Sequence, residues 1–299
     1  CPLPGLGGGR LLVAPLAPSN LHVIAVDPDA EKVARHHRRL DDLGLYGTRA
    51  AVLTGDICSI DLSPYLAGLV VSEDLAAAGF RRGEEFARRL FQSLRPYGGT
   101  AVLPVPESAQ REFRALIDRI ELSNAEIGRT ADGSNLRLTR SGALAGSAEW
   151  THQYADAGNS VASRDALVKA PLGILWFGGP SNEKVLPRHG HGPTPQVAGG
   201  RLFIEGRHMM RAVDVYTGRL LWAREFTDLG RYYDYTSHEP GANAIGSNYV
   251  SLADSVYVIH GSTCHRLDAA TGETIDEFRA PAAAGEEGAP EWGYLSVVG

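Results

Sequence analysis

The chain has 299 residues, a net charge of −6 and 3 cysteines, Cys1, Cys58 and Cys264. This length leaves room for two domains that each bury a hydrophobic core. The modest, unclustered charge argues against a nucleic-acid partner, and the scattered cysteines argue against a disulfide framework or a C-x-x-C metal or redox site. No apolar run reaches the roughly 18 residues that would cross a membrane.

Residues 1–140 alternate short apolar runs with helical patterns, which is typical of a parallel sheet with crossover helices. Asp29 is predicted to cap the first long helix, and the pair His36-His37 is placed on its solvated face. A hairpin is expected around Asp132-Gly133. The expected strands are 21–26, 50–54, 66–72 and 100–105, the expected helices are 30–43, 83–94 and 108–120, and the hairpin covers 126–140.

Acidic residues stand directly after three successive predicted strands: Asp27, Asp56 and the pair Glu73-Asp74. Because ligands of an open parallel sheet bind outside the carboxyl ends of its strands, these side chains are expected to face a ligand. Upstream, the glycine loop 5–9 precedes a predicted helix, and its glycines let the backbone approach a ligand closely. Asp27 lies 22 residues after Gly5, a reach that suits a carboxylate accepting hydrogen bonds from a ribose diol.

The loop does not match the dinucleotide fingerprint G-x-G-x-x-G, because Arg10 stands at the sixth position. The chain instead resembles the class I S-adenosylmethionine-dependent methyltransferases over about residues 5–140. The segments that carry the resemblance are GLGGG (5–9), VIAVDPD (23–29), LTGD (53–56), LVVSED (69–74) and LRPYGG (94–99).

The resemblance implies a binding role for eight residues. Gly5, Gly7 and Gly9 would pass the methionine part of S-adenosylmethionine, Asp27 would hold the ribose, Asp56 and Ile57 would hold the adenine, and Ser72 and Glu73 would line the floor near the reactive methyl group. No metal ligand is expected.

The chain also departs from the family pattern. The first strand of the fold is largely missing, since only CPLP stands before the glycine loop and its prolines are not expected to pair in a ladder. Pro15 is expected to kink or end the helix after the loop. No acceptor-side loop of the Asn-Pro-Pro-Tyr type follows the fourth strand, so no catalytic residue is predicted. The chain is expected to be truncated at both ends, which leaves the compartment open.

The second half repeats itself. Residues 201–226 align without a gap with residues 255–280, at an offset of 54 residues. Each copy reads as strand, turn, strand, a D-x-x-T-G corner and a further strand, with Asp214 and Gly218 matching Asp268 and Gly272 in the two corners. This pattern indicates a repeat architecture and is typical of a β-propeller blade.

Trp222 follows the first corner and is predicted to pack between blades, whereas its counterpart in the second copy is Asp276. We expect residues 141–149 to be a linker and residues 150–299 to form a partial propeller of about three blades, fewer than the roughly four to eight that close a ring.

The segment LDAATGE (267–273) resembles the repeats of pyrroloquinoline-quinone-type (PQQ-type) propellers. The order of the whole chain resembles a bacterial family that fuses a methyltransferase-like domain to such a propeller, and residues 149–165 stand where that family begins its propeller. PQQ itself is not expected, because the chain has no adjacent cysteines. The resemblance implies a protein or small-molecule partner on the propeller, and by analogy an exported or periplasmic parent.

Three functions follow from these patterns: a methyltransferase whose propeller binds a partner or substrate, a non-enzymatic propeller scaffold with a degenerate methyltransferase domain, and a PQQ-dependent oxidoreductase, which the cysteine usage disfavours. Among further polar residues, His152 and Asp156 are expected to make structural hydrogen bonds at the start of the propeller. The aromatic cluster 231–235 is the leading surface candidate, and the histidines 189, 191, 208 and 238 match no zinc spacing.

Overall fold

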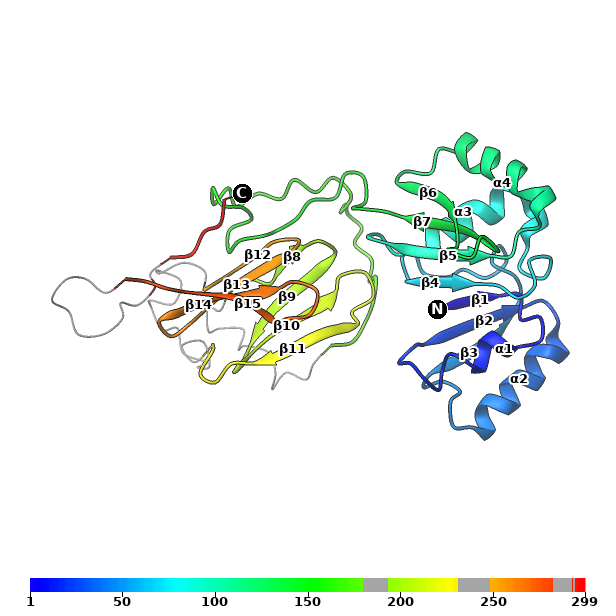
Figure 1. Cartoon of the computed structure of the whole chain (residues 1–299), viewed down its shortest axis with the longest axis horizontal. Coiled ribbons are helices and arrows are strands. Elements are labelled where there is room, and N and C mark those ends of the chain that lie inside the picture. Colours follow the sequence, from blue (N-terminus) through cyan, green and yellow to red (C-terminus); the bar gives the residue numbers. More distant parts are fainter. Residues whose placement is uncertain (180–192, 231–247, 282–291, 293, 299) are drawn as a thin grey trace. The chain divides into compact units, whose positions relative to one another are not determined.

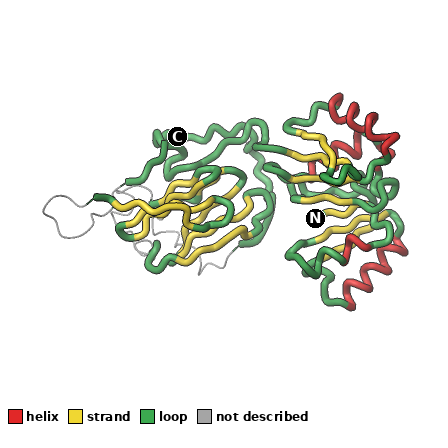
Figure 2. Tube along the Cα trace, in the orientation of Figure 1, coloured by secondary structure: helices red, strands yellow, loops and turns green. Residues whose placement is uncertain are grey.

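The computed structural model describes residues 1–179, 193–230, 248–281, 292 and 294–298. The chain divides into two compact units, Cys1–Ala145 and Gly146–Gly299. The first unit mixes helices and strands, and the described part of the second contains strands and loops (Figures 1 and 2). No described helix is long and apolar enough to cross a membrane. Histidines 189, 191 and 238 and the cluster 231–235 lie outside the described residues.

The first unit contains the strands and helices that the sequence predicts, with boundaries that differ by a few residues. Its strands are β1 (Pro2–Pro4), β2 (Val23–Asp27), β3 (Ala50–Thr54), β4 (Leu69–Val71), β5 (Gly99–Leu103), β6 (Ala125–Arg129) and β7 (Leu136–Arg140), and its helices are α1 (Arg10–Val13), α2 (Ala30–Asp42), the 3₁₀ turn η1 (Phe80–Arg82), α3 (Glu84–Ser93) and α4 (Glu107–Arg119). Helix α1 ends before Pro15, as expected.

The strands of this unit reverse their order between β1 and β4. Strands β1, β2 and β3 pair in parallel in that order, and a second group is ordered β4-β5-β7-β6 with β7 antiparallel to both neighbours. The carbonyl of Gly5 accepts the N–H groups of Glu73 at 3.1 Å and Asp74 at 3.2 Å, which sets the end of β1 beside the end of β4 (Figure 1). A reversal of this kind is the topological switch point at which open α/β sheets bind ligands.

The first strand is present, which corrects the expectation that its prolines exclude it from the ladder. The carbonyl of Cys1 accepts an N–H group of β2 at 3.1 Å, and the N–H group of Gly5 donates to a β2 carbonyl at 2.7 Å. The backbone groups of Cys1 and Gly5 therefore point toward β2, and those of the residues between them alternate in direction along the strand. The nitrogens of Pro2 and Pro4 point away from β2. The missing N–H groups therefore cost no hydrogen bond to β2.

Helix α2 begins at the predicted cap. The Asp29 carboxylate accepts the N–H groups of Glu31 at 2.9 Å and Lys32 at 3.0 Å. The solvated placement of the histidine pair is wrong for His36, which is buried on the inner face of the helix. Val33, His36 and Leu40 follow a three-then-four spacing, and this spacing keeps residues on one helix face. His37 is exposed.

The described second unit is built from two four-stranded antiparallel sheets that repeat the same pattern. The first sheet is ordered β8-β9-β10-β11 and the second β12-β13-β14-β15. Strands β9 (Arg201–Gly206), β10 (Met209–Asp214) and β11 (Leu220–Glu225) match β13 (Ser255–His260), β14 (Thr263–Asp268) and β15 (Thr274–Arg279) at the predicted offset of 54 residues, and the short strands β8 (Gln196–Ala198) and β12 (Tyr249–Ser251) open the two sheets.

In both D-x-x-T-G corners the aspartate accepts hydrogen bonds from its own turn. Asp214 Oδ1 accepts the N–H groups of the second and third residues after it at 2.9 and 3.2 Å, and Asp268 Oδ1 accepts the equivalent N–H groups at 2.8 and 2.8 Å. Gly218 and Gly272 have φ angles of 69° and 75°, which favour glycine. Trp222 Nε1 donates to the carbonyl of Ala269 at 3.0 Å, so this tryptophan packs against the corner of the second sheet.

Replacing Gly272 by alanine should destabilise the second unit by about 3 kcal/mol, because a Cβ there would lie 2.6 Å from the Trp222 ring in a backbone of positive φ. Gly261 is the matched control: it has a φ of 60° with nothing within 4 Å of the added Cβ, so its alanine variant should lose only about 1 kcal/mol. Urea unfolding of both variants makes the comparison. Equal losses of unfolding free energy in the two variants would mean that the Trp222 ring does not pack tightly against the Gly272 corner.

Candidate functional site

The predicted cofactor residues lie at the carboxyl ends of β1 to β4, around the switch point. The loop between β1 and α1 has three glycines in the left-handed region, Gly5, Gly7 and Gly9, with φ angles of 74°, 49° and 73°. A Cβ on Gly5 would lie 1.9 Å from the carbonyl oxygen of Asp74, and one on Gly7 would lie 2.6 Å from the Cβ of Glu73. Glycine is therefore required where the loop passes the end of β4.

Asp27 is fully buried at the end of β2 and holds this loop in place. Its Oδ2 accepts the N–H group of Leu6 at 2.9 Å and lies 3.1 Å from Lys32 Nζ, while its Oδ1 accepts the N–H group of Asp29 at 3.0 Å. Two backbone donors and one ammonium group compensate the buried charge. The carboxylate thus positions the glycine loop, and its contact with a ribose stays a prediction.

Glu73, the second residue after β4, also contacts the glycine loop. Its Oε2 accepts the N–H group of Gly8 at 3.0 Å, and its Oε1 accepts the N–H group of Leu11. A carboxylate of the chain itself therefore takes up loop donors that could otherwise receive an anionic group of a ligand.

Asp56 lies after β3 and is also held by neighbours. Its Oδ1 accepts the N–H groups of Cys58 at 3.0 Å and Ser59 at 2.8 Å, and its Oδ2 lies 3.3 Å from Arg82 Nη2. The side chain of Ile57 is buried in the hydrophobic core. The assignment of Asp56 and Ile57 to an adenine ring stays a prediction.

Ser72 closes β4 as a buried residue whose hydroxyl has no hydrogen-bond partner. Burying an unpartnered hydroxyl costs about 1–3 kcal/mol, so such a group calls for a partner. Together with the glycine loop, this hydroxyl fits a site that receives a polar ligand.

The ring of His36 packs against the glycine loop at Gly9, and the sequence analysis did not predict it as a residue of this site. A Cβ on Gly9 would lie 2.2 Å from its ring. Burial, followed by the charges of Arg35 and Arg39, lowers the pKa of His36, so the ring is neutral near pH 7. The helical spacing between Val33 and Leu40 was the signal that could have placed it inside.

Other candidate groups have structural roles. His152 Nδ1 pairs with the hydroxyl of Thr151 at 2.7 Å, and its Nε2 accepts the N–H group of Val297 at 3.3 Å. Asp156 accepts hydrogen bonds from the N–H groups of Gly158 and Ser160 at 3.0 and 3.2 Å. These bonds agree with the expected anchoring role. Among the described residues, no three histidine, cysteine or acidic side chains gather into a metal site.

No protein-family model matches the chain, and neither does any curated protein. Solved structures similar to it include a Methanococcus maripaludis protein described as an S-adenosyl-L-methionine-dependent methyltransferase (17% identity, TM-score 0.41, 48% of this chain and 77% of that one). Others are the [4+2]-cyclase SpnF (14%, 0.34, 44% and 54%) and an Aquifex aeolicus SAM-dependent methyltransferase (17%, 0.34, 46% and 78%). With TM-scores below 0.5, these matches are statements of similarity and nothing more.

Proposed function

We propose that the first unit binds S-adenosylmethionine at the switch point between β1 and β4 and transfers its methyl group. The observation that carries the proposal is the glycine loop 5–9, which meets the end of β4 so closely that Gly5 and Gly7 tolerate no side chain. The unpartnered hydroxyl of buried Ser72 lies at the end of the same strand. A loop of this kind brings backbone N–H groups up to a ligand.

In this proposal the residues around the loop contact different parts of the cofactor. Asp27 fixes the loop through Leu6, and any rotation of its carboxylate toward a ribose would exchange the bond to Lys32 for ribose hydroxyls. The donors of Gly8 and Leu11 can receive a carboxylate of the ligand once Glu73 turns away. Ser72 can donate its hydroxyl to the ligand. The bound cofactor would supply an electrophilic methyl group, and the protein would contribute mainly positioning of the acceptor in line with it.

We further propose that the second unit is part of a β-propeller that binds a partner or substrate. The support is a second copy of the contact between a tryptophan and a D-x-x-T-G corner. Trp176 Nε1 donates to the carbonyl of Val215 at 2.9 Å, as Trp222 does to Ala269, and a Cβ on Gly218 would lie 2.3 Å from the Trp176 ring. Trp176 thus contacts the first sheet as Trp222 contacts the second, which fits a blade preceding β8.

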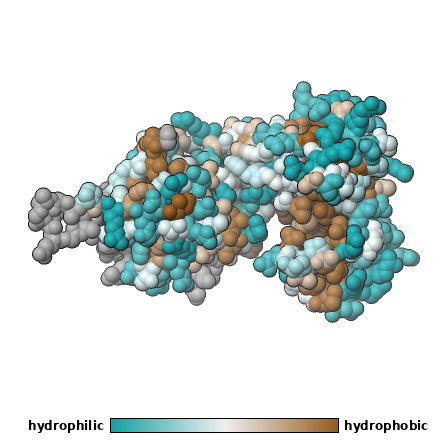
Figure 3. All heavy atoms as spheres, viewed as in Figure 1, coloured by the Kyte–Doolittle hydropathy of each residue, from teal (hydrophilic) through white to brown (hydrophobic). Residues whose placement is uncertain are grey.

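The segment around Trp176 carries exposed apolar side chains. Leu172, Ile174 and Phe177 are 76%, 85% and 97% exposed. The face drawn in Figure 3 is largely hydrophilic, with separate apolar patches. Further strands of such a blade would cover side chains of this kind.

A non-enzymatic scaffold is the second candidate, and one observation favours it. Asp27, Asp56 and Glu73 already have partners within the chain, so the acidic residues need no ligand to satisfy them. In that case the α/β unit would be a folded relic and the repeats would carry the function.

Calorimetry with S-adenosylmethionine separates the two candidates. Gly8 is exposed, lacks a positive φ, and an added Cβ would meet only Glu73 Oε2 at 3.8 Å, so substitution there should leave the fold intact. We expect micromolar binding by the wild type and by Gly8→Ala, and a loss of at least about tenfold in Gly8→Leu, whose side chain fills the space above the loop. No binding by the folded wild type would overturn the proposal.

A further inference from the structure

A pocket lies in the first unit, at the same edge of the sheet as the glycine loop. It has a volume of about 310 Å³ and is lined by the residues after β5, the first turn of α4, the end of β6 and the hairpin turn. A space of this size is at the lower end of those that hold small ligands. Its lining residues are Pro104, Val105, Pro106, Glu107, Gln110, Arg129, Gly133 and Ser134.

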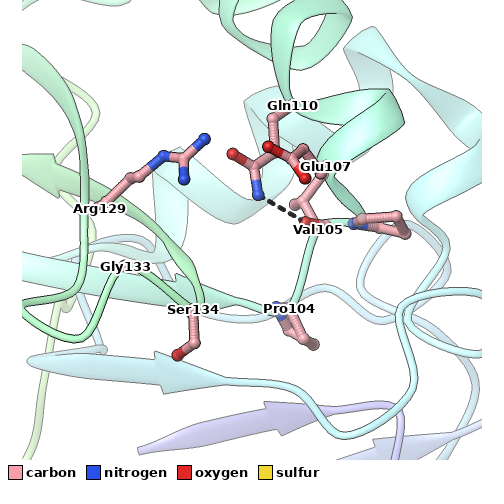
Figure 4. Close-up of a pocket in the computed structure, with 8 residues that line it drawn as sticks. Pro104, Val105, Glu107, Gln110, Arg129, Gly133 and Ser134 are labelled. Carbon is pink, nitrogen blue, oxygen red and sulfur yellow. Dashed lines mark hydrogen bonds between the residues drawn. The ribbon is translucent and has the colours of Figure 1, made fainter.

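Gln110 presents an unsatisfied acceptor to this pocket. The residue is 6% exposed, and its Nε2 donates to the carbonyl of Val105 at 3.0 Å. This bond fixes which end of the amide is nitrogen, so Oε1 is the atom that turns to the pocket (Figure 4). Oε1 is buried and has no hydrogen-bond partner, which leaves it in need of a donor.

Arg129 supplies a cation on the other wall. Figure 4 shows its guanidinium and the amide oxygen of Gln110 turned toward one another across the pocket. The two walls are held together, since Arg114 of α4 donates to the carbonyls of Ile127 at 3.4 Å and Gly128 at 3.2 Å, next to Arg129 on β6. The β6 backbone beside Arg129 is therefore tied to the helix that carries Gln110.

The chemistry of these groups specifies the ligand. A guanidinium binds a carboxylate through two parallel hydrogen bonds. Gln110 Oε1 requires an N–H or O–H donor, and the carboxylate of Glu107 beside it favours a cationic donor such as an ammonium group. A molecule with an ammonium group next to its carboxylate satisfies all three.

We infer that this pocket binds an α-amino carboxylate, with the carboxylate on Arg129 and the ammonium group on Gln110 and Glu107. The inference deepens the proposed function and rests on it in one respect: if the switch point binds S-adenosylmethionine, this ligand is the class of molecule that accepts the methyl group. Binding itself needs no cofactor, because every named contact comes from α4, β6 and their loops.

The test is binding of free L-amino acids to the full chain without S-adenosylmethionine, measured by calorimetry, with propionate and L-lactate as analogues of L-alanine that lack the ammonium group. We expect millimolar or tighter binding of at least one amino acid and weaker binding of the analogues. Arg129→Gln and Gln110→Leu should each weaken that binding about tenfold or more. Arg119→Gln, at the far exposed end of α4, should not change it.

Two results would overturn the inference: no amino acid binds the folded chain, or binding is equal in Arg129→Gln and the wild type. Since Arg129 is exposed, its variant tests the pocket even if Gln110→Leu fails to fold. The two proposals fail separately. Amino-acid binding without S-adenosylmethionine binding would remove the methyltransferase function and keep the pocket, and the reverse result would remove the pocket's assignment alone.

Discussion

Replacing Asp27 by alanine should lower the free energy of unfolding of the first unit by about 3–5 kcal/mol, the cost of breaking a buried charge pair from one side. The substitution leaves Lys32 without its carboxylate and the N–H groups of Leu6 and Asp29 without their acceptor. Urea unfolding followed by circular dichroism at neutral pH measures the loss. A variant this unstable would lose ligand binding for structural reasons, so it cannot serve alone as a test of the cofactor site.

Asp29 is the matched control for this substitution. It is an exposed aspartate two residues along the chain that caps α2 through the N–H groups of Glu31 and Lys32. Its alanine variant should lose only about 1 kcal/mol, the usual cost of a helix cap. Similar losses in the two variants would contradict the role of Asp27 as the buried anchor of the glycine loop.

Replacing Glu205 by glutamine should remove most of a pH dependence of stability in the second unit. Glu205 lies on β9, and burial raises its pKa from 4.5 to about 8. A carboxyl whose pKa is raised on folding favours the folded state below its unfolded pKa, and this contribution is lost as the pH rises from 4.5 through about 8. The full loss amounts to about 5 kcal/mol by linkage. The neutral amide of glutamine has no proton to release.

Unfolding measured at about pH 5 and about pH 9 tests this prediction. The wild type should be markedly less stable at the higher pH, and Glu205→Gln should be more stable than the wild type there. Glu225→Gln is the control, since Glu225 is exposed on β11 and its substitution should leave the wild-type profile unchanged. A Glu205→Gln profile as steep as that of the wild type would show that the buried carboxyl is not the source.

Local patterns predicted the elements of the fold well. The cap of α2 depends on a carboxylate and the N–H groups that follow it within three residues, and the corners depend on Asp214, Asp268 and the turns after them. The sequence offset between the two repeats could be predicted because the strands, the turn and the corner have the same lengths in both. Such features depend on neighbours in sequence, so the sequence displays them directly.

Tertiary contacts account for what could not be predicted. Whether the nitrogens of Pro2 and Pro4 face a neighbouring strand depends on where β2 lies. The burial of His36 depends on its contact with the glycine loop. Trp176 stands outside the aligned repeats, so its equivalence to Trp222 appears only through the contacts of the two rings. Gln110 reads as a polar residue of an amphipathic helix until its bond to Val105 directs Oε1 into a pocket.

For the candidate site, the sequence predicted which strand ends carry the residues but not how those residues interact. Gly5, Asp27 and Glu73 do meet at the switch point. The ion pairs of Asp27 with Lys32 and of Asp56 with Arg82 were not predicted, because an ion pair depends on side-chain direction as well as on position along the chain.

The most direct test of the central proposal is an amide-resolved NMR titration of the full chain with S-adenosylmethionine. We predict that the N–H signals of the loop 5–9 and of Leu11 shift with the added ligand, together with those of Ser72 and Glu73, because these amides lie at the switch point. The signals of β8 to β15 should stay unchanged. A titration that moves no amide of the loop, or only amides of the second unit, would contradict a cofactor site between β1 and β4.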